Sequence, residues 1–223
     1  ILISGAGEKA FCAGGDIRAL YESMCSPEGP IFAETFFESE YRLDYKIHNF
    51  QKPIISILDG IVMGGGAGLM FASTYKIATE RTKFAMPEIG VGLFPDVGFT
   101  SVIKDLPEGL GLYIMLTASP LNASDLVFCN LADSYLSSAK MEDFLTDVVE
   151  LSWHDDVKQN LTLLDSILNS SSYLKGVESF PVSKIEGELD KIQSMTNEED
   201  LFGVIDNIMS HTEDDEWFKK GQE

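Results

Sequence analysis

Two glycine-rich turns constrain the fold of this chain more than any other feature of its sequence. Residues 11–16 read FCAGGD, and residues 63–68 read MGGGAG. Each turn follows a short apolar run that is typical of a strand, at residues 1–4 and 53–58, and each precedes a stretch that is typical of a helix. Glycine permits sharp bends and lets another group approach the backbone N–H closely. The pattern therefore predicts two strand–turn–helix units, with their turns placed side by side by a sheet.

Turns placed in this way would point two amide N–H groups at one oxygen atom, which is the geometry of an oxyanion hole. The alternative is two unrelated tight turns, because short glycine motifs are common. A third segment favours the first interpretation. Residues 84–98 read FAMPEIGVGLFPDVG and place Glu88 and Asp96 among apolar residues, glycines and prolines. Acids in such surroundings are candidates for shifted pKa values and catalysis, although Asp96 would also suit a turn cap.

The first 140 residues alternate short apolar runs with helical stretches, which is typical of an α/β fold. The helix predicted over residues 31–50 carries apolar side chains that we expect to form a buried stripe, namely Phe32, Phe36, Tyr41, Leu43 and Ile47. From about residue 138 the pattern changes to helices separated by polar loops. We therefore predict a core over residues 1–138 and an acidic helical region over residues 139–223. The chain begins inside a predicted strand, so we expect the core to lack its N-terminal part and the helical region to continue further.

The net charge is −20, and it is uneven along the chain. Residues 1–140 hold 10 basic and 16 acidic residues, whereas residues 141–223 hold 6 and 20. This charge argues against binding to nucleic acids or anionic membranes, both of which attract basic surfaces. No apolar run approaches the roughly 20 residues that a membrane span needs. The three cysteines (Cys12, Cys25 and Cys129) lack metal-ligand spacing, so we predict no metal site and a reducing compartment.

Four motifs, taken in order, resemble the crotonase (enoyl-CoA hydratase/isomerase) superfamily, and within it the 3-hydroxyisobutyryl-CoA hydrolases. They are residues 9–18 (KAFCAGGDIR), 51–53 (QKP), 59–66 (DGIVMGGG) and 84–98. The resemblance runs from Ile1 to about Leu136 and is weaker beyond. It implies a spiral of βββα repeats with appended helices and a trimer-type homo-oligomer. It also implies an acyl-CoA substrate, with coenzyme A as part of the substrate and no separate cofactor.

The same resemblance assigns roles to residues of both turns and of the helix between them. It implies that the amides of Gly15 and Gly65 bind the acyl-thioester oxygen, and Gly65 opens a predicted helix whose positive end would help. Glu40 matches an acid that approaches the substrate, where a carboxylate would accept a hydrogen bond from a 3-hydroxyl group. The alternative for Glu40 is that it is one of several exposed helix acids, with Glu34, Glu38 and Asp44 nearby.

The two acids of the third segment match catalytic positions of the hydrolase branch. Glu88 would lie beside the thioester carbonyl and act either as a general base or as a nucleophile that forms a mixed anhydride. Asp96 would orient the water or the proton. Gly68 stands where enoyl-CoA hydratases carry a second catalytic glutamate, so the resemblance favours hydrolysis over hydration.

We therefore predict hydrolysis of an acyl-CoA thioester, specifically 3-hydroxyisobutyryl-CoA to 3-hydroxyisobutyrate and coenzyme A in valine breakdown. One alternative keeps the fold but performs hydration, isomerisation or hydrolysis of another acyl-CoA. A further alternative is a non-catalytic acyl-CoA-binding scaffold. The expected compartment is the cytoplasm in a bacterium and the mitochondrial matrix in a eukaryote.

Overall fold

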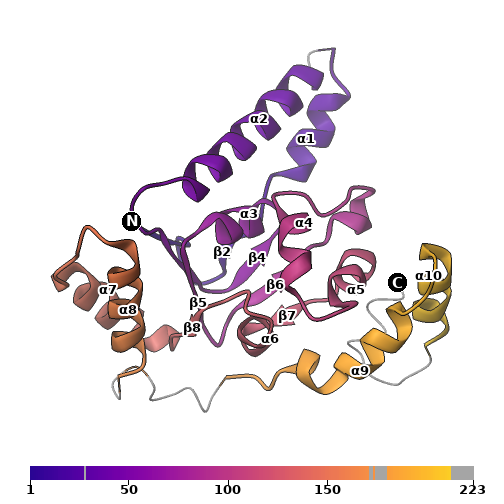
Figure 1. The fold of residues 1–223 in the computed structure, drawn as a ribbon. Coiled ribbons are helices and arrows are strands. Elements are labelled where there is room, and N and C mark those ends of the chain that lie inside the picture. The colour runs from indigo at the N-terminus through magenta and orange to yellow at the C-terminus, as the bar shows by residue number, and fades with distance from the viewer. Residues whose placement is uncertain (28, 171–172, 174–179, 212–223) are drawn as a thin grey trace.

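The computed structural model describes residues 1–27, 29–170, 173 and 180–211. Two four-stranded sheets form its centre, and helices surround them (Figure 1). The first sheet has the order β1-β3-β5-β8 and is parallel throughout, with strands Leu2–Ser4, Ile55–Leu58, Tyr75–Ala78 and Ser134–Tyr135. The second has the order β2-β4-β6-β7, with strands Ala10–Cys12, Ile61–Met63, Lys83–Ala85 and Leu121–Asn122, of which only the last pairs antiparallel. The predicted α/β class is confirmed.

Strands β1 to β6 alternate between the two sheets, so the chain winds through both. The step from β3 to β4 takes only Asp59 and Gly60. Gly60 has a φ of +85°, and a Cβ there would lie 2.5 Å from the carbonyl oxygen of Lys9. This step therefore requires glycine. The sequence analysis did not predict β2, β4 or β6, because three-residue strands are too short to show a period-2 pattern.

Helices α1 (Ile17–Met24) and α2 (Gly29–His48) form a hairpin that projects from the sheets (Figure 1). The carboxylate of Asp16 caps α1 by accepting the N–H of Ala19 at 3.0 Å. The buried stripe predicted for α2 is wrong in part. Ile47 is buried and Phe36 is half-buried, but the exposed fractions of Phe32, Tyr41 and Leu43 are 44–49%. The physical reason is that α2 packs mainly on α1 and on α3 (Gly65–Ala72), which leaves much of its surface uncovered.

The main hydrophobic core lies between the second sheet and four helices that pack near it. These helices are α3, α4 (Phe99–Val102), α5 (Leu110–Thr117) and α6 (Ala123–Phe128). The core's most deeply buried side chains include Val62, Met70, Phe84, Met86, Phe99, Leu110, Ile114, Leu121 and Leu126. This core fixes the strand ends from which both glycine turns begin.

The acidic helical region contacts the sheets and helices at two separate places. Helices α7 (Met141–Glu150) and α8 (Val157–Leu168) pack on a second core cluster beneath the first sheet. Helix α9 (Lys184–Thr196) packs on α5 and α6, and α10 (Leu201–Ser210) packs on α9. The predicted division near residue 138 stays a prediction, and residues 171–172, 174–179 and 212–223 of the predicted region lie outside the described residues. No helix within the described ranges is long and apolar enough to cross a membrane.

A buried carboxylate ties α9 to the core. Oδ1 of Asp125 in α6 accepts the N–H groups of Lys184 and Ile185, at 2.7 and 2.9 Å, and Oδ2 accepts the N–H of Asn122 at 2.9 Å. Asp125 thus satisfies donors at the first turn of α9, which have no acceptor within that helix. A long-range contact of this kind cannot be read from the local sequence pattern.

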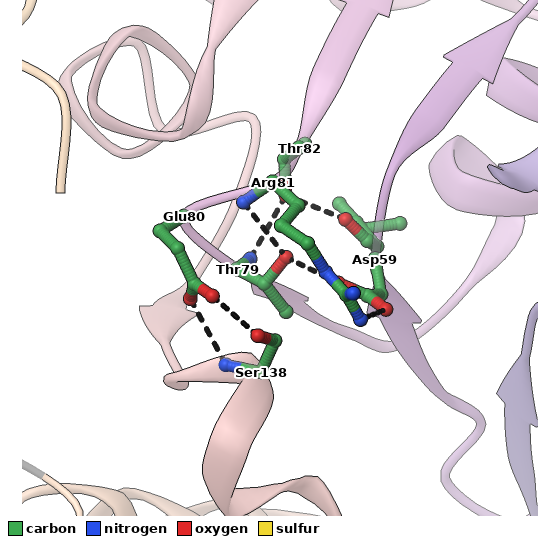
Figure 2. Close-up of polar contacts among 7 residues, drawn as sticks. Asp59, Thr79, Glu80, Arg81, Thr82 and Ser138 are labelled. Atoms are coloured by element: carbon green, nitrogen blue, oxygen red, sulfur yellow. Dashed lines mark hydrogen bonds and ion pairs between the residues drawn. The ribbon is translucent and has the colours of Figure 1, made fainter. Parts of the chain in front are cut away.

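A polar network connects the loop between β3 and β4 with the loop between β5 and β6 (Figure 2). Asp59 is only 4% exposed, and it accepts hydrogen bonds from the hydroxyl of Thr79 at 2.8 Å and from Nε of Arg81 at 2.9 Å. Nη2 of Arg81 binds its other oxygen, which makes the pair bidentate. On the other side of the same loop, Glu80 accepts the N–H of Ser138 at 2.9 Å and its hydroxyl. The network holds the loop between β5 and β6 against Asp59 on one side and Ser138 on the other.

Replacing Arg81 by Met is expected to lower the free energy of unfolding by about 2 kcal/mol, because Asp59 would keep a buried charge without its cation. The 37% exposure of the Arg81 side chain keeps this value below that of a fully buried pair. Arg42→Met is the matched control, since Arg42 pairs with Glu38 on the surface and should change the free energy by less than about 0.5 kcal/mol. Urea denaturation measures both. Equal losses would contradict the assigned role of Asp59.

Candidate active site

The two glycine turns lie side by side, as the sequence predicts. Strands β2 and β4 pair in parallel, so their turns leave the sheet at the same edge. A Cβ on Gly14 would lie 2.9 Å from the carbonyl oxygen of Met63 and 3.1 Å from the amide nitrogen of Gly65. Gly65 is the first residue of α3, and the first N–H groups of a helix have no acceptor within it. The second turn therefore presents free amides beside the first.

One cavity of about 140 Å³ is lined by all five residues that the sequence analysis assigned to the site: Gly15, Glu40, Gly65, Glu88 and Asp96. Its remaining lining is mostly apolar and includes Ile17, Leu20, Phe36, Phe37, Pro87, Val91 and Leu93. Apolar walls lower the local dielectric, which strengthens every charge interaction inside. The structure thus brings the five residues together, while their chemical roles stay predictions.

Glu88 is the first residue of the short 3₁₀ helix η1 (Glu88–Val91), and it is 7% exposed. Its Oε2 is buried and has no hydrogen-bond partner among the described residues. Burial is the main cause that raises the pKa of Glu88, and the charge of Asp96 adds to it, although a backbone hydrogen bond acts in the opposite direction. A carboxylate with a free oxygen and a raised pKa is a good proton acceptor near neutral pH.

Asp96 is held by a hydrogen bond from α2. The phenol of Tyr41 donates to Oδ2 of Asp96, so this carboxylate contacts a separate helix rather than only its own turn. The backbone oxygen of Asp96 accepts the N–H of Phe99 at 2.8 Å, and that bond shapes the turn. Burial, followed by the hydrogen bond to Asp96, raises the pKa of Tyr41, which keeps the phenol protonated as a donor.

Glu40 points into the cavity rather than to solvent. Glu34 and Glu38 are exposed, whereas Glu40 is half-buried. A Cβ on Gly65 would lie 1.9 Å from Oε1 of Glu40, so this carboxyl group rests directly against the second turn. Burial is the largest cause that raises the pKa of Glu40 to about 7, and the charges of Asp96 and then Asp44 add to it. Glu40 therefore differs from the exposed acids Glu34 and Glu38 of the same helix.

Asp44 and Tyr41 are the residues of this site that sequence reasoning missed. Asp44 follows Glu40 by one helical turn, and both of its carboxyl oxygens are buried without a hydrogen-bond partner among the described residues. Burial and the charge of Asp96 raise the pKa of Asp44 to about 6. The spacing of four residues from Glu40 is the available signal, since it places two residues on one helix face.

The space beside Gly68 is occupied by other side chains. A Cβ on Gly68 would lie 2.5 Å from Oδ2 of Asp44 and 2.9 Å from Cβ of Val97. A glutamate at this position therefore has no room in the structure. Among the described residues, no group of three His, Cys, Asp or Glu side chains is placed to hold a metal ion.

Comparison with known proteins identifies the family of this chain. A family model described as "Enoyl-CoA hydratase/isomerase" matches residues 1–223. A Danio rerio protein named "3-hydroxyisobutyryl-CoA hydrolase, mitochondrial" is 38% identical over 208 residues, which are 93% of this chain and 53% of that protein. A Neurospora crassa protein named "Small ribosomal subunit protein mS47" is 38% identical over 175 residues, which are 77% of this chain and 34% of that protein.

A solved structure gives the same result at the level of the fold. The crystal structure of a carnitinyl-CoA dehydratase from Mycobacterium thermoresistibile is 32% identical with a TM-score of 0.81, and the match covers 99% of this chain and 60% of that one. The chain spans about half the length of the curated hydrolase relatives that it matches over 93% of its residues.

Proposed function

Because this chain belongs to the enoyl-CoA hydratase/isomerase family, we propose that its full-length protein hydrolyses an acyl-CoA thioester, with 3-hydroxyisobutyryl-CoA as the substrate. Membership of this family confirms the predicted resemblance and the crotonase-like fold. Curated relatives that carry the hydrolase name support the proposed reaction. The main observation in support of this reaction is that one cavity is lined by both glycine turns and by Glu88 and Asp96.

In the proposed reaction, the N–H groups of Gly15 and Gly65 bind the thioester carbonyl oxygen. Charge grows on this oxygen when the carbonyl is attacked, and two preorganised donors stabilise it by several kcal/mol relative to water. Gly65 also opens α3, so the positive end of the helix dipole points at the same place. The close approach of the two turns supports this assignment.

Glu88 supplies the attack in either of two ways. As a general base it takes a proton from water through Oε2, and the resulting hydroxide adds to the carbonyl. As a nucleophile it forms a mixed anhydride, which water then cleaves. In both routes the C–S bond breaks and coenzyme A leaves as the thiol after it gains a proton. Asp96, held by Tyr41, orients the water or carries that proton.

Specific observations bear on the two alternatives, a hydratase and a non-catalytic protein. A hydratase with a second acid at residue 68 is disfavoured, because Asp44 and Val97 fill that space. A non-catalytic role is favoured by the relative from Neurospora crassa, whose name places it in a ribosomal subunit. The retention of both glycine turns and of Glu88 and Asp96 favours catalysis over this alternative.

The deciding experiment measures thiol release from 3-hydroxyisobutyryl-CoA by the full-length protein, with hydration of crotonyl-CoA assayed in parallel. Fast thiol release with little hydration is the expected result. Hydration without thiol release would replace the hydrolase proposal by the hydratase alternative. Binding of the acyl-CoA without either reaction would favour the non-catalytic role.

The remaining parts of the proposal follow from the family. The substrate brings its own coenzyme A, so the reaction needs no separate cofactor. The assembly is a trimer-type homo-oligomer, which light scattering during gel filtration would measure. The compartment is the mitochondrial matrix in a eukaryotic source and the cytoplasm in a bacterial one. The relatives named mitochondrial support the first of these.

A further inference from the structure

Four carboxyl groups crowd around the site: Glu40, Asp44, Glu88 and Asp96. None of them forms an ion pair with any described residue. Carboxylates that share a site without a cation do not all carry a charge at once, because each negative charge raises the pKa of its neighbours. This crowding therefore favours a proton on one of the four near neutral pH.

The carboxyl group of Asp44 is placed where no described cation offsets its charge. It extends from α2 toward α3 and lines two cavities. One cavity, of about 480 Å³, is shared with Asp96, and the other, of about 450 Å³, is shared with Glu40. Its two oxygens are buried and have no partner among the described residues, and Oδ2 abuts Gly68. The Asp44 carboxyl group therefore acts on its neighbours through charge, not through hydrogen bonds.

The carboxyl group of Glu40 lies beside the proposed oxyanion site, so its charge would affect the reaction directly. Its Oε1 rests against Gly65, whose N–H is proposed to hold the thioester oxygen. A negative charge on Glu40 would repel the oxyanion that forms there, and the apolar walls would strengthen this repulsion. A proton on Glu40 removes the opposing charge.

We propose that Glu40 works as a neutral acid beside the oxyanion site, and that Asp44 is a positioning residue whose negative charge keeps the proton on Glu40. This inference rests on the proposed function, since the oxyanion arises only if the thioester is attacked. Asp44 lies one helical turn from Glu40, and both acids line the same cavity. Burial is the largest cause that raises the pKa of Glu40 to about 7, and the charges of Asp96 and then Asp44 add to it.

Other titratable groups face this pair and have to be considered. Asp96, from the loop after η1, raises the pKa of both acids, and Glu88 lies in the same cavity as Glu40. The groups of α2 that line a cavity with Asp44 are Tyr41, Tyr45 and His48. From α3 and from the loop after η1, Gly68 and Val97 line a cavity with Asp44 and bring no charge.

The test is the pH profile of thioester hydrolysis by the full-length protein between pH 5 and pH 9. In the wild type, activity should fall as the pH rises through about 7, because Glu40 loses its proton. Asp44→Asn removes one of the two charges that raise the pKa of Glu40, so the midpoint of this fall should move to lower pH by roughly half a unit. In Glu40→Gln the fall should disappear, since the amide has no proton to lose. Asp44→Ser serves as a second neutral variant if Asp44→Asn does not fold.

Glu38→Gln is the matched control, because Glu38 lies exposed on the same helix and pairs with Arg42. It should keep the wild-type midpoint. An unchanged midpoint in Asp44→Asn would overturn the role of Asp44. A fall that persists in Glu40→Gln would overturn the role of Glu40.

A second measurement does not depend on activity. Carbon-13 NMR of the carboxyl groups, with the Glu40 signal assigned by its loss in Glu40→Gln, gives the pKa of Glu40 directly. We expect about 7 in the wild type and a lower value in Asp44→Asn. An ordinary glutamate pKa in the wild type would overturn the inference even if thioester hydrolysis is confirmed. If no acyl-CoA is hydrolysed, the proposed function fails by itself, and the titration still decides where the proton lies.

Discussion

Glu88→Gln is expected to lower kcat for thioester hydrolysis by on the order of 10³-fold or more, because the amide can neither accept the proton of water nor form an anhydride. Gln keeps the size of the side chain, so the acyl-CoA should still bind. Steady-state thiol release gives kcat, and calorimetry with a coenzyme A thioester gives Kd. Glu34→Gln is the matched control, since Glu34 is exposed on α2 and should leave kcat unchanged.

The stability of the same variant provides an independent check of the environment of Glu88. Its pKa is raised in the folded protein, mainly by burial, so ionised Glu88 destabilises the fold when the pH lies above that pKa. The neutral amide removes this cost. Glu88→Gln should therefore be at least as stable as the wild type at pH 8 while it is inactive. Near-normal turnover would remove Glu88 from the proposed mechanism, and a marked loss of stability at pH 8 would contradict a strained buried charge.

Gly66→Ala is expected to lower kcat by on the order of 10²-fold and to reduce the free energy of unfolding by about 2 kcal/mol. A Cβ at this position would lie 2.0 Å from the carbonyl oxygen of Cys12, which is a backbone atom of β2. Helix α3 has to move away from the first turn, and the amide of Gly65 moves with it. The two proposed oxyanion donors would then no longer converge on one atom.

Gly90→Ala is the matched control for this change. Gly90 belongs to η1 next to the site, and a Cβ there meets nothing within 4 Å. It should leave both kcat and the denaturation midpoint close to the wild type. If Gly66→Ala loses stability but keeps its kcat, the spacing of the two turns does not serve the reaction, and the proposed oxyanion role of Gly65 would have to be abandoned.

Local sequence patterns were enough for the long elements and for the residue types of the site. Helix α2 was predicted from the apolar side chains spaced along it, and the buried strand β3 was predicted from a continuous apolar run. The three-residue strands β2, β4 and β6 were missed, because their pairing partners, not their own composition, make them strands. The attachment of α9 to the core was also not predicted, because Asp125, sixty residues earlier, accepts N–H groups of its first turn in addition to its own N-cap Ser183.

The sequence by itself determined which chemistry this chain contains: free amides in two glycine turns, and acids set among apolar residues. Both follow from local rules, since glycine alone permits the turns and burial of an acid is unusual without a purpose. Only the tertiary structure decided between the two interpretations of Glu40 and added Asp44 to the site. Helical spacing indicates that Glu40 and Asp44 share a face, but it does not say what that face packs against. The contact with Gly65 and Gly68 settles this, because two backbones approach closely only where side chains are absent.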